Sequence, residues 1–376
     1  MSQQLNLAIC GGGVGGLCAA IACLNAGHQV QVYEKAKAFL RIGADVNLTP
    51  NAVKCLDGLG VGDIIRETAA RPTHRLSRTW DTGEITSNIV MGNEAEERYG
   101  APQLTIHRGD LLKALEQQLP SDIIHLDHGV ESITHSDAGS DIQFEGNRSA
   151  SADLVVGADG IHSVVRRSLF GADQPEFTGL VSYRAVIPRS AVDVPNLDAF
   201  TKWWGPTPDM QLVVFPLTLG EEVFIFATTP QEGWYDESWT MPGDVDELRE
   251  VYADFHPEVQ QLLGAVTAVT KSALYVREPM PTWHLGRATV IGDAAHPMVP
   301  FMAQGACMAI EDGVVLSRCL SEVGSADIAK ALARFERARL ERTANVQRGS
   351  RANDWLKQGG NADWVYGYDA WNVTLN

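Results

Sequence analysis

The chain has 376 residues, 30 Lys and Arg against 47 Asp and Glu, and a formal net charge of −17 at pH 7. This length exceeds the usual size of one hydrophobic core, so two domains are expected. A hydrophobic share of 45% and a charged share of 20% are typical of a globular protein. The negative charge argues against nucleic acid or an anionic membrane as partner, and no apolar run is long enough to span a bilayer.

The first element expected is a strand over 5–10 that runs into a glycine-rich turn and then a helix. Gly11, Gly13 and Gly16 fall in the G-x-G-x-x-G register of a nucleotide-binding turn. Gly11 permits the tight turn, Gly13 lets the backbone approach a pyrophosphate, and Gly16 allows helix and strand to pack closely. The anion would then lie on the helix N-terminus. A glycine-rich turn that binds nothing is the alternative.

A second strand over 29–33 ends at Glu34. Glu34 follows the glycines at about 20 residues, the spacing of a ribose-binding acid. Its carboxylate would accept hydrogen bonds from ribose hydroxyls and repel a 2′-phosphate. The site is therefore expected to hold the ADP half of FAD or NAD rather than NADP.

Further along the chain, periodicity predicts strands and helices in two groups. Aromatic and β-branched runs at hairpin spacing between 179 and 229 predict an antiparallel sheet in a second domain. The other strands and helices expected are a helix over 51–59, a strand over 103–108, a helix over 109–119, a meander over 123–144, a strand over 152–160, helices over 244–255 and 257–266, a strand over 287–293, and long helices over 305–320 and 328–356.

Two of these later strands end in polar motifs. The first motif runs from Asp159 to Arg166, and the second begins at Gly292-Asp293. A second strand-end carboxylate can accept hydrogen bonds from the ribityl hydroxyls of a flavin. A helix that starts near Gly305 points N–H groups at the flavin or its phosphates. NAD needs no such second patch far downstream, whereas an extended FAD does, so the motifs together predict FAD.

On these motifs the chain resembles the class A flavoprotein aromatic hydroxylases, a group that includes salicylate and 4-hydroxybenzoate hydroxylases. The stretches most similar to the 6-hydroxynicotinate 3-monooxygenases are 106–111, 202–204, 303–309 and 364–369. The resemblance implies bound FAD, transient NADH or NADPH, and O2 that forms a hydroperoxide at flavin C4a. It also implies oxygen transfer to a small aromatic substrate, a hydroxylated pyridine or benzoate, with or without decarboxylation.

The resemblance further implies which residues hold the cofactor. The glycine loop and Glu34 would hold the ADP half, Arg108 would contact the FAD chain, and Asp293 would hold the ribityl and phosphate region. The other positions implied to border FAD or nicotinamide are Val14, Gly15, Lys35, Arg41, Gly43, Ala44, Asp159, Arg166, Pro300, Gly305 and Ala306. Pro297 would lie with Gly305 against the reactive edge of the flavin.

Several side chains are candidates for contact with the substrate. His296 would act as a base or back the flavin, and Tyr183 would bond a substrate oxygen or pack in its strand. Gln304 would bind substrate or cap the long helix. Trp203, Trp204, Phe215 and Phe301 would form an aromatic slot or belong to the core. Asn47 and Phe301 stand where the hydroxynicotinate enzymes have histidines, which predicts a more apolar pocket and leaves the substrate open.

The fold class expected is α/β. A Rossmann-like (GR2-type) FAD-binding domain over 1–75, 100–176 and 276–325 is interleaved with a β-sheet substrate domain over 76–99 and 177–275. The C-terminal helix and aromatic tail occupy 326–376. Six scattered cysteines without a Cys-x-x-Cys pair predict reduced thiols in a cytoplasmic protein and no metal site. The sequence is compatible with a homodimer but leaves the oligomeric state open. An FAD oxidase or dehydrogenase and a non-catalytic FAD-fold binding protein are the alternative functions.

Overall fold

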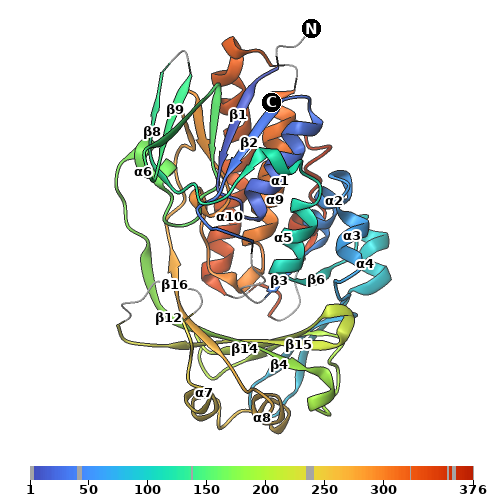
Figure 1. The fold of residues 1–376 in the computed structure, drawn as a ribbon. Coiled ribbons are helices and arrows are strands. Elements are labelled where there is room, and N and C mark those ends of the chain that lie inside the picture. The colour runs from blue at the N-terminus through green and yellow to red at the C-terminus, as the bar shows by residue number, and fades with distance from the viewer. Residues whose placement is uncertain are drawn as a thin grey trace.

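A computed structural model describes residues 4–39, 45–136, 139–233, 241–321, 323–353, 355–357 and 361–375. The chain forms two main sheets, one above the other in Figure 1. No helix within these ranges is both long enough and apolar enough to cross a membrane.

The upper sheet is almost entirely parallel and carries the N-terminal strand near its centre (Figure 1). Its strands are β1 (Asn6–Cys10), β2 (Gln29–Tyr33), β7 (Ile124–His125), β11 (Leu154–Gly157), β17 (His284–Leu285) and β18 (Ala288–Val290). Their order is β17-β18-β11-β1-β2-β7, and only β17 runs antiparallel to its neighbour. β1 and β11 are buried, apolar and short, which suits strands that are covered on both faces.

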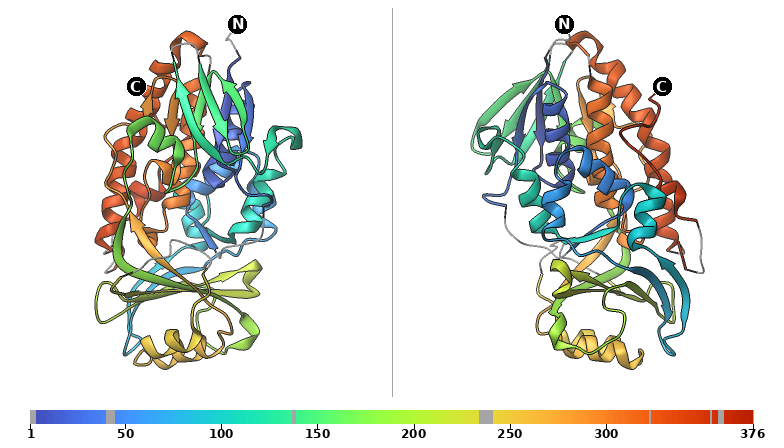
Figure 2. Two further views of the ribbon diagram at one scale, coloured as in Figure 1. Left: turned by 60° about the vertical axis from the view of Figure 1, so that its left-hand side comes forward. Right: turned by 90° about the vertical axis from the view of Figure 1, so that its right-hand side faces the viewer.

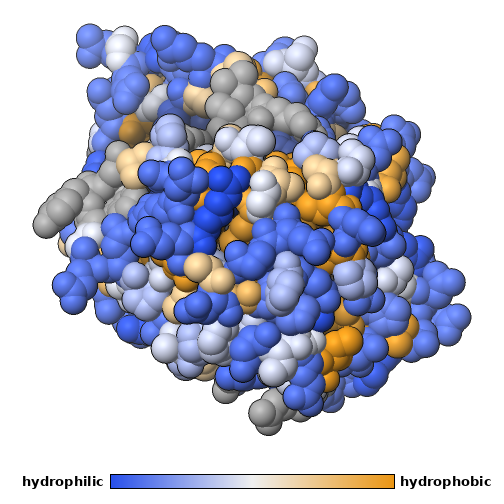
Figure 3. All heavy atoms as spheres, turned by 90° about the horizontal axis from the view of Figure 1, so that it is seen from below, coloured by the Kyte–Doolittle hydropathy of each residue, from blue (hydrophilic) through white to orange (hydrophobic). Residues whose placement is uncertain are grey.

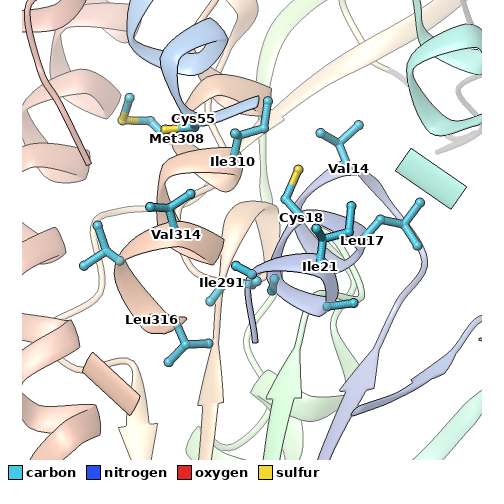
Figure 4. Packing of buried hydrophobic residues seen from close by; sticks show 14 of the residues in the cluster. Val14, Leu17, Cys18, Ile21, Cys55, Ile291, Met308, Ile310, Val314 and Leu316 are labelled. Atoms are coloured by element: carbon cyan, nitrogen blue, oxygen red, sulfur yellow. The ribbon is translucent and has the colours of Figure 1, made fainter. Parts of the chain in front are cut away.

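Helices pack around the sheet in this upper half (Figure 1). They are α1 (Val14–Asn25), α2 (Pro50–Gly58), α3 (Gly62–Arg66), α4 (Gly92–Tyr99), α5 (Arg108–Glu116), α6 (Val164–Phe170), α9 (Gly305–Leu320), α10 (Ile328–Ala352) and α11 (Asp363–Tyr366). Cys18 and Ile21 of α1 lie in one apolar cluster with Ile310 and Val314 of α9 (Figure 4). The two helices approach closely at Gly313, because glycine has no Cβ there. A Cβ at this position would lie only 2.7 Å from the backbone nitrogen of Ala19.

Two smaller sheets complete the upper half. One contains β8 (Val130–His135), β9 (Ser140–Phe144) and β10 (Arg148–Ala152), and the other pairs β3 (Asp45–Leu48) with β6 (Leu104–His107). Ile142 and Phe144 of β9 join the same core as α1 and β1. The meander predicted over 123–144 therefore supplies a second layer to the parallel sheet.

The lower sheet has seven strands in the order β16-β12-β15-β14-β13-β4-β5, all antiparallel except for the parallel pair β13–β4. Their bounds are β4 (His74–Thr79), β5 (Ile85–Val90), β12 (Glu176–Pro188), β13 (Phe200–Trp204), β14 (Gln211–Leu217), β15 (Glu222–Pro230) and β16 (Thr270–Val276). Helices α7 (Val245–Val251) and α8 (Pro257–Gly264) cover its outer face, and its inner face looks toward the parallel sheet (Figures 1 and 2). Viewed from the side of α7 and α8, the surface is mostly hydrophilic (Figure 3).

The predicted α/β fold class is confirmed, and helix 305–320 coincides with α9. The second long helix ends at Ala352 rather than 356, because Asn353 adopts a left-handed conformation with φ 48°. Strand β16 and helix α4 were not predicted. The predicted domain limits remain an interpretation of this arrangement.

Candidate active site

The glycine loop after β1 leaves one side open. A Cβ at Gly11 (φ +113°) would lie 2.3 Å from the Ala158 carbonyl oxygen, and one at Gly16 would lie 2.0 Å from the Gly11 carbonyl oxygen. A Cβ at Gly13 would meet no heavy atom of the described residues within 4 Å. Gly13 is also the N-cap of α1 and gives it no side-chain cap. The N–H groups of the first turn, which contains Val14 and Gly15, therefore point from the open side of the loop.

Glu34 is fixed beside this loop. Its carboxylate accepts hydrogen bonds from the Gly12 N–H at 2.7 Å and the Ala36 N–H at 2.8 Å. Lys35 next to it is exposed. The acid that ends β2 therefore lies against the glycine turn, as the spacing predicts.

Arg108 and Asp293 bring two further chain segments to the same edge. Arg108 begins α5, Asp293 lies in the 3₁₀ turn η4 (Gly292–Ala294), and both are exposed. Partial withdrawal from water lowers the pKa of Arg108, and the charges of Asp293 and Glu34 raise it. A Cβ at Gly305, the first residue of α9, would lie 4.0 Å from Asp293 Oδ1. Strand ends far apart in sequence therefore converge on one edge, made of the glycine loop, Glu34, Arg108 and Asp293. This edge is the candidate for cofactor binding and is called the nucleotide-binding edge.

The Asp159–Arg166 motif is engaged within the protein. The Asp159 carboxylate accepts hydrogen bonds from the Val164 N–H at 2.7 Å and from the Ser163 hydroxyl at the start of α6. Arg166 is buried, pairs with Asp173 at 2.6 Å and donates to the Ala294 carbonyl at 3.1 Å. Arg166 thus holds the turn that presents Asp293.

His296 is fully buried, and its Nε2 lies 2.6 Å from Asp312. Burial alone would raise the pKa of Asp312, but His296 and Arg339 outweigh burial and hold this pKa at about 2. The ring is covered by protein and holds η4 against α9, which argues against His296 as a base that touches substrate. The alternative, that His296 backs the flavin, stays a prediction. Pro297 is also buried, whereas Pro300 is exposed and Gly305 and Ala306 are half-buried.

The inner face of the seven-stranded sheet carries the aromatic wall. Phe215 stacks on Phe200 with centroids 5.1 Å apart and contacts Phe224. Phe301, in the 3₁₀ turn η5 (Pro300–Met302), belongs to the same apolar cluster. Because Phe301 comes just before Gly305, this wall adjoins the nucleotide-binding edge. Asn47 on β3 is buried and accepts from Gln103 at 2.9 Å, and its Nδ2 has no partner among the described residues.

Tyr183 and Trp203 were predicted as substrate contacts and lie on the other face. Both belong to the cluster that packs under α7 and α8. Side chains alternate along a strand, so Trp203 points outward while its neighbours Lys202 and Trp204 point inward. The side chain of Gln304 is engaged within the protein, because its amide donates to Thr49 Oγ1 at 2.8 Å and its carbonyl accepts from Asn51 at 3.2 Å. Gln304 is the N-cap residue of α9, although its side chain makes no capping bond, and that side chain ties α9 to α2.

The prediction omitted several inner-face residues. Lys202 of β13 and Arg75 of β4 are buried there, and burial lowers the pKa of Arg184 on β12 to about 10 against the effect of Asp45. Strand alternation from Phe200 would have placed Lys202 beside the aromatic wall. The predicted flavin neighbours Arg41, Gly43 and Ala44 lie outside the described residues.

The nucleotide-binding edge suits an FAD dinucleotide. The open side at Gly13 and the uncapped start of α1 fit an anionic diphosphate. The exposed Arg108 and Asp293 extend the edge toward Gly305. Residues 4–350 match the family of the FAD binding domain. The chain belongs to this family.

Relatives of this FAD-binding chain agree with the geometry. The 6-hydroxynicotinate 3-monooxygenase of Pseudomonas fluorescens is 38% identical over 378 residues, which cover 100% of this chain and 98% of the relative. A salicylate hydroxylase substrate complex has a TM-score of 0.86 at 26% identity and covers 98% of this chain and 96% of its own. HpxO of Klebsiella pneumoniae, complexed with FAD and uric acid, has a TM-score of 0.84 at 26% identity, covering 97% and 91%. These similarities confirm FAD as cofactor and identify a flavin-dependent monooxygenase.

Proposed function

We propose that the protein hydroxylates a small aromatic compound, a hydroxylated pyridine or benzoate, with FAD, NADH or NADPH, and O2. One observation carries the proposal. Phe301 belongs to the aromatic inner-face cluster and lies just before Gly305, which adjoins Asp293. An aromatic ring on that face would therefore lie beside the flavin. The names of the relatives support this class of substrate.

The proposed cofactor contacts follow from the geometry. The N–H groups from Gly11 to Gly16 would hold the diphosphate, Glu34 the ribose, and Arg108 and Asp293 the chain toward the flavin. Lys35, Pro300, Gly305 and Ala306 lie along the same edge. The redox chemistry, electron transfer from reduced nicotinamide to O2, is what FAD supplies when bound.

Other residues position the cofactor contacts or line the substrate side. Arg166 holds the carbonyl of Ala294 and His296 pairs with Asp312, so both are positioning residues for Asp293. Asp159 fixes the start of α6. On the substrate side, Phe215 and Phe301 orient the ring by apolar contact and exclude water, and Asn47 offers an N–H to a polar substituent.

The test is a screen of the purified holoenzyme. We expect a flavin absorption spectrum and NAD(P)H consumption that a carboxylated phenol or hydroxypyridine stimulates. The product should contain one more oxygen atom than the substrate, and in a decarboxylative reaction it should also have lost CO2. Peroxide equal to the NAD(P)H consumed with every compound would favour an FAD oxidase or dehydrogenase. A colourless protein would favour the non-catalytic binding protein. Parallel assays with NADH and NADPH decide the reductant.

Location and assembly are further parts of the proposal. The six cysteines are free and buried, which fits a reducing compartment such as the cytoplasm. Fractionation of the source cells tests the location, and sedimentation velocity tests the homodimer.

A further inference from the structure

Three basic side chains gather at one end of the inner face. Lys202 projects from β13, Arg75 from the neighbouring β4, and Lys357 from the segment after α10. We call them the cationic cluster. The segment after α10 covers this end of the sheet, since the Ser77 hydroxyl donates to the Leu356 carbonyl at 3.3 Å. The cluster therefore lies between the sheet and the C-terminal part of the chain.

Lys202 is buried, with only 5% of its surface exposed. Its Nζ donates to Asn353 Oδ1 at 2.8 Å and lies 3.6 Å from the centroid of the Trp204 ring. It also lies 5.8 Å from the centroid of Phe301, the aromatic residue next to the nucleotide-binding edge. The ammonium thus borders the surface on which the aromatic substrate is proposed to lie.

The charge of Lys202 has no acidic partner among the described residues. Arg75, which is 6% exposed, places its guanidinium 4.7 Å from the centroid of Phe200 and 5.1 Å from that of Trp355. Its side chain makes one hydrogen bond among the described residues, a long 3.4 Å contact to the Tyr366 hydroxyl. Lys357 Nζ lies 4.8 Å from the centroid of Trp204. Burial, followed by the charges of Arg75 and Lys357, holds the pKa of Lys202 well below its usual range.

Two neutral donors at the same end also lack partners. The indole N–H groups of Trp204 and Trp355 are buried and have no hydrogen-bond acceptor among the described residues. Buried donors without acceptors and buried cations without anions are both unfavourable, and an anion would satisfy both. The net charge of −17 means that the chain as a whole repels acids, so this cluster is a local exception.

We propose that Lys202, flanked by Arg75 and Lys357, binds the carboxylate of an aromatic acid, which makes this cluster the determinant of substrate class. The inference rests on the proposed function. Trp204, Phe200 and Phe301 provide ring faces beside the cations, which suits a planar arene that carries the carboxylate. An uncharged phenol or amide would leave the cations without a counter-charge.

The experiment compares acids with their amides on the holoenzyme without NAD(P)H. Equilibrium dialysis would measure the Kd of salicylate, 4-hydroxybenzoate and 6-hydroxynicotinate and of the three corresponding amides. For at least one pair, we expect Lys202→Met to weaken acid binding by about ten- to a hundredfold and to change amide binding less than about twofold. Lys202→Arg keeps the charge and should bind that acid more tightly than Lys202→Met.

Lys271→Met is the matched control. Lys271 is a buried lysine of the same sheet, but it lies on the outer face and pairs with Glu247 at 2.7 Å. This variant should leave the ratio of acid to amide Kd unchanged. If Lys202→Met loses its fold or flavin, Lys357→Met is measured instead and should weaken acid binding at least about threefold, with amide binding unchanged.

Equal losses for acid and amide, or no loss for either, would overturn the inference and leave Lys202 as an anchor for Asn353 alone. If uncharged phenols bind the wild-type protein as well as acids do and are hydroxylated, the inference fails while the proposed function stands. If no compound stimulates NAD(P)H consumption, the proposed function fails, and the acid–amide comparison still reports on the cluster.

Discussion

Two glycines of the first loop should separate folding from cofactor binding when each is changed to alanine. The Cβ of Gly16→Ala would lie 2.0 Å from the Gly11 carbonyl oxygen and 3.3 Å from Ala158 Cβ. These atoms belong to a buried turn and strand end, so α1 must shift, at a cost of about 3 kcal/mol in free energy of unfolding. The Cβ of Gly13→Ala would meet no atom of the described part of the chain within 4 Å, and φ of −76° suits alanine.

The stability of Gly13→Ala should therefore stay near that of the wild-type protein. Replacing the N-cap glycine by alanine lowers the free energy of unfolding by about 1 kcal/mol. Alanine also reduces the conformational entropy of the unfolded chain, which offsets most of this loss. The added methyl does, however, occupy the side from which the diphosphate would approach. Loss of one charge-assisted hydrogen bond, about 1.5–3 kcal/mol, predicts FAD binding weaker by about ten- to a hundredfold.

The assays are urea unfolding of the flavin-free proteins and titration of each with FAD, followed by flavin fluorescence. Gly13→Ala should show a wild-type midpoint and a raised Kd, and Gly16→Ala a lowered midpoint. Wild-type FAD affinity in Gly13→Ala would refute the assignment of the open side to the diphosphate. An unchanged midpoint in Gly16→Ala would refute the close contact.

Three further outcomes are expected. Asp293→Ala should weaken FAD retention about tenfold while Asp293→Asn loses less, as measured by flavin content after gel filtration; a fully yellow, fully active Ala variant contradicts the assignment. Arg339→Met should lower the free energy of unfolding by about 3–5 kcal/mol, because Glu311 and Asp312 are fully buried and would lose the guanidinium that lies 2.6 and 2.8 Å from them. A loss under about 1 kcal/mol in urea unfolding would argue against this. The pKa of Asp312 is depressed to about 2, so its ionised form stabilises the fold by about 2 kcal/mol above pH 4 and loses this contribution as pH falls from about 4 to 2. The decline in Tm over that range should flatten in Asp312→Asn, and parallel curves would disprove the link.

Local patterns predicted the nucleotide-binding edge well, because its residues act through the backbone around them. The glycine spacing and the acid after β2 predict the turn, and Glu34 does accept the Gly12 N–H. Asp293 follows a buried strand, and the ends of parallel strands meet at one edge of a sheet. These features depend on neighbours in sequence and on one topological rule.

The substrate face was harder to predict because it depends on register. Trp203 and Trp204 are adjacent, and one step along β13 decides which of them faces inward. Gln304 and His296 have polar partners on other elements, Thr49 and Asp312, that no local pattern reveals. Lys202 could be placed on the inner face by alternation, but the segment over it comes from far along the chain.

That late segment also bears on how the protein is made and handled. Asn353 bonds Lys202 and the Pro208 carbonyl, so residues near the end of the chain complete a wall whose strands are synthesised much earlier. A truncation close to residue 353 would also remove Val365, Tyr366 and Ala370 from the core of the nucleotide half. A substitution of Asn353 alone would accordingly leave a coloured protein that still takes electrons from nicotinamide but discriminates less well among aromatic rings.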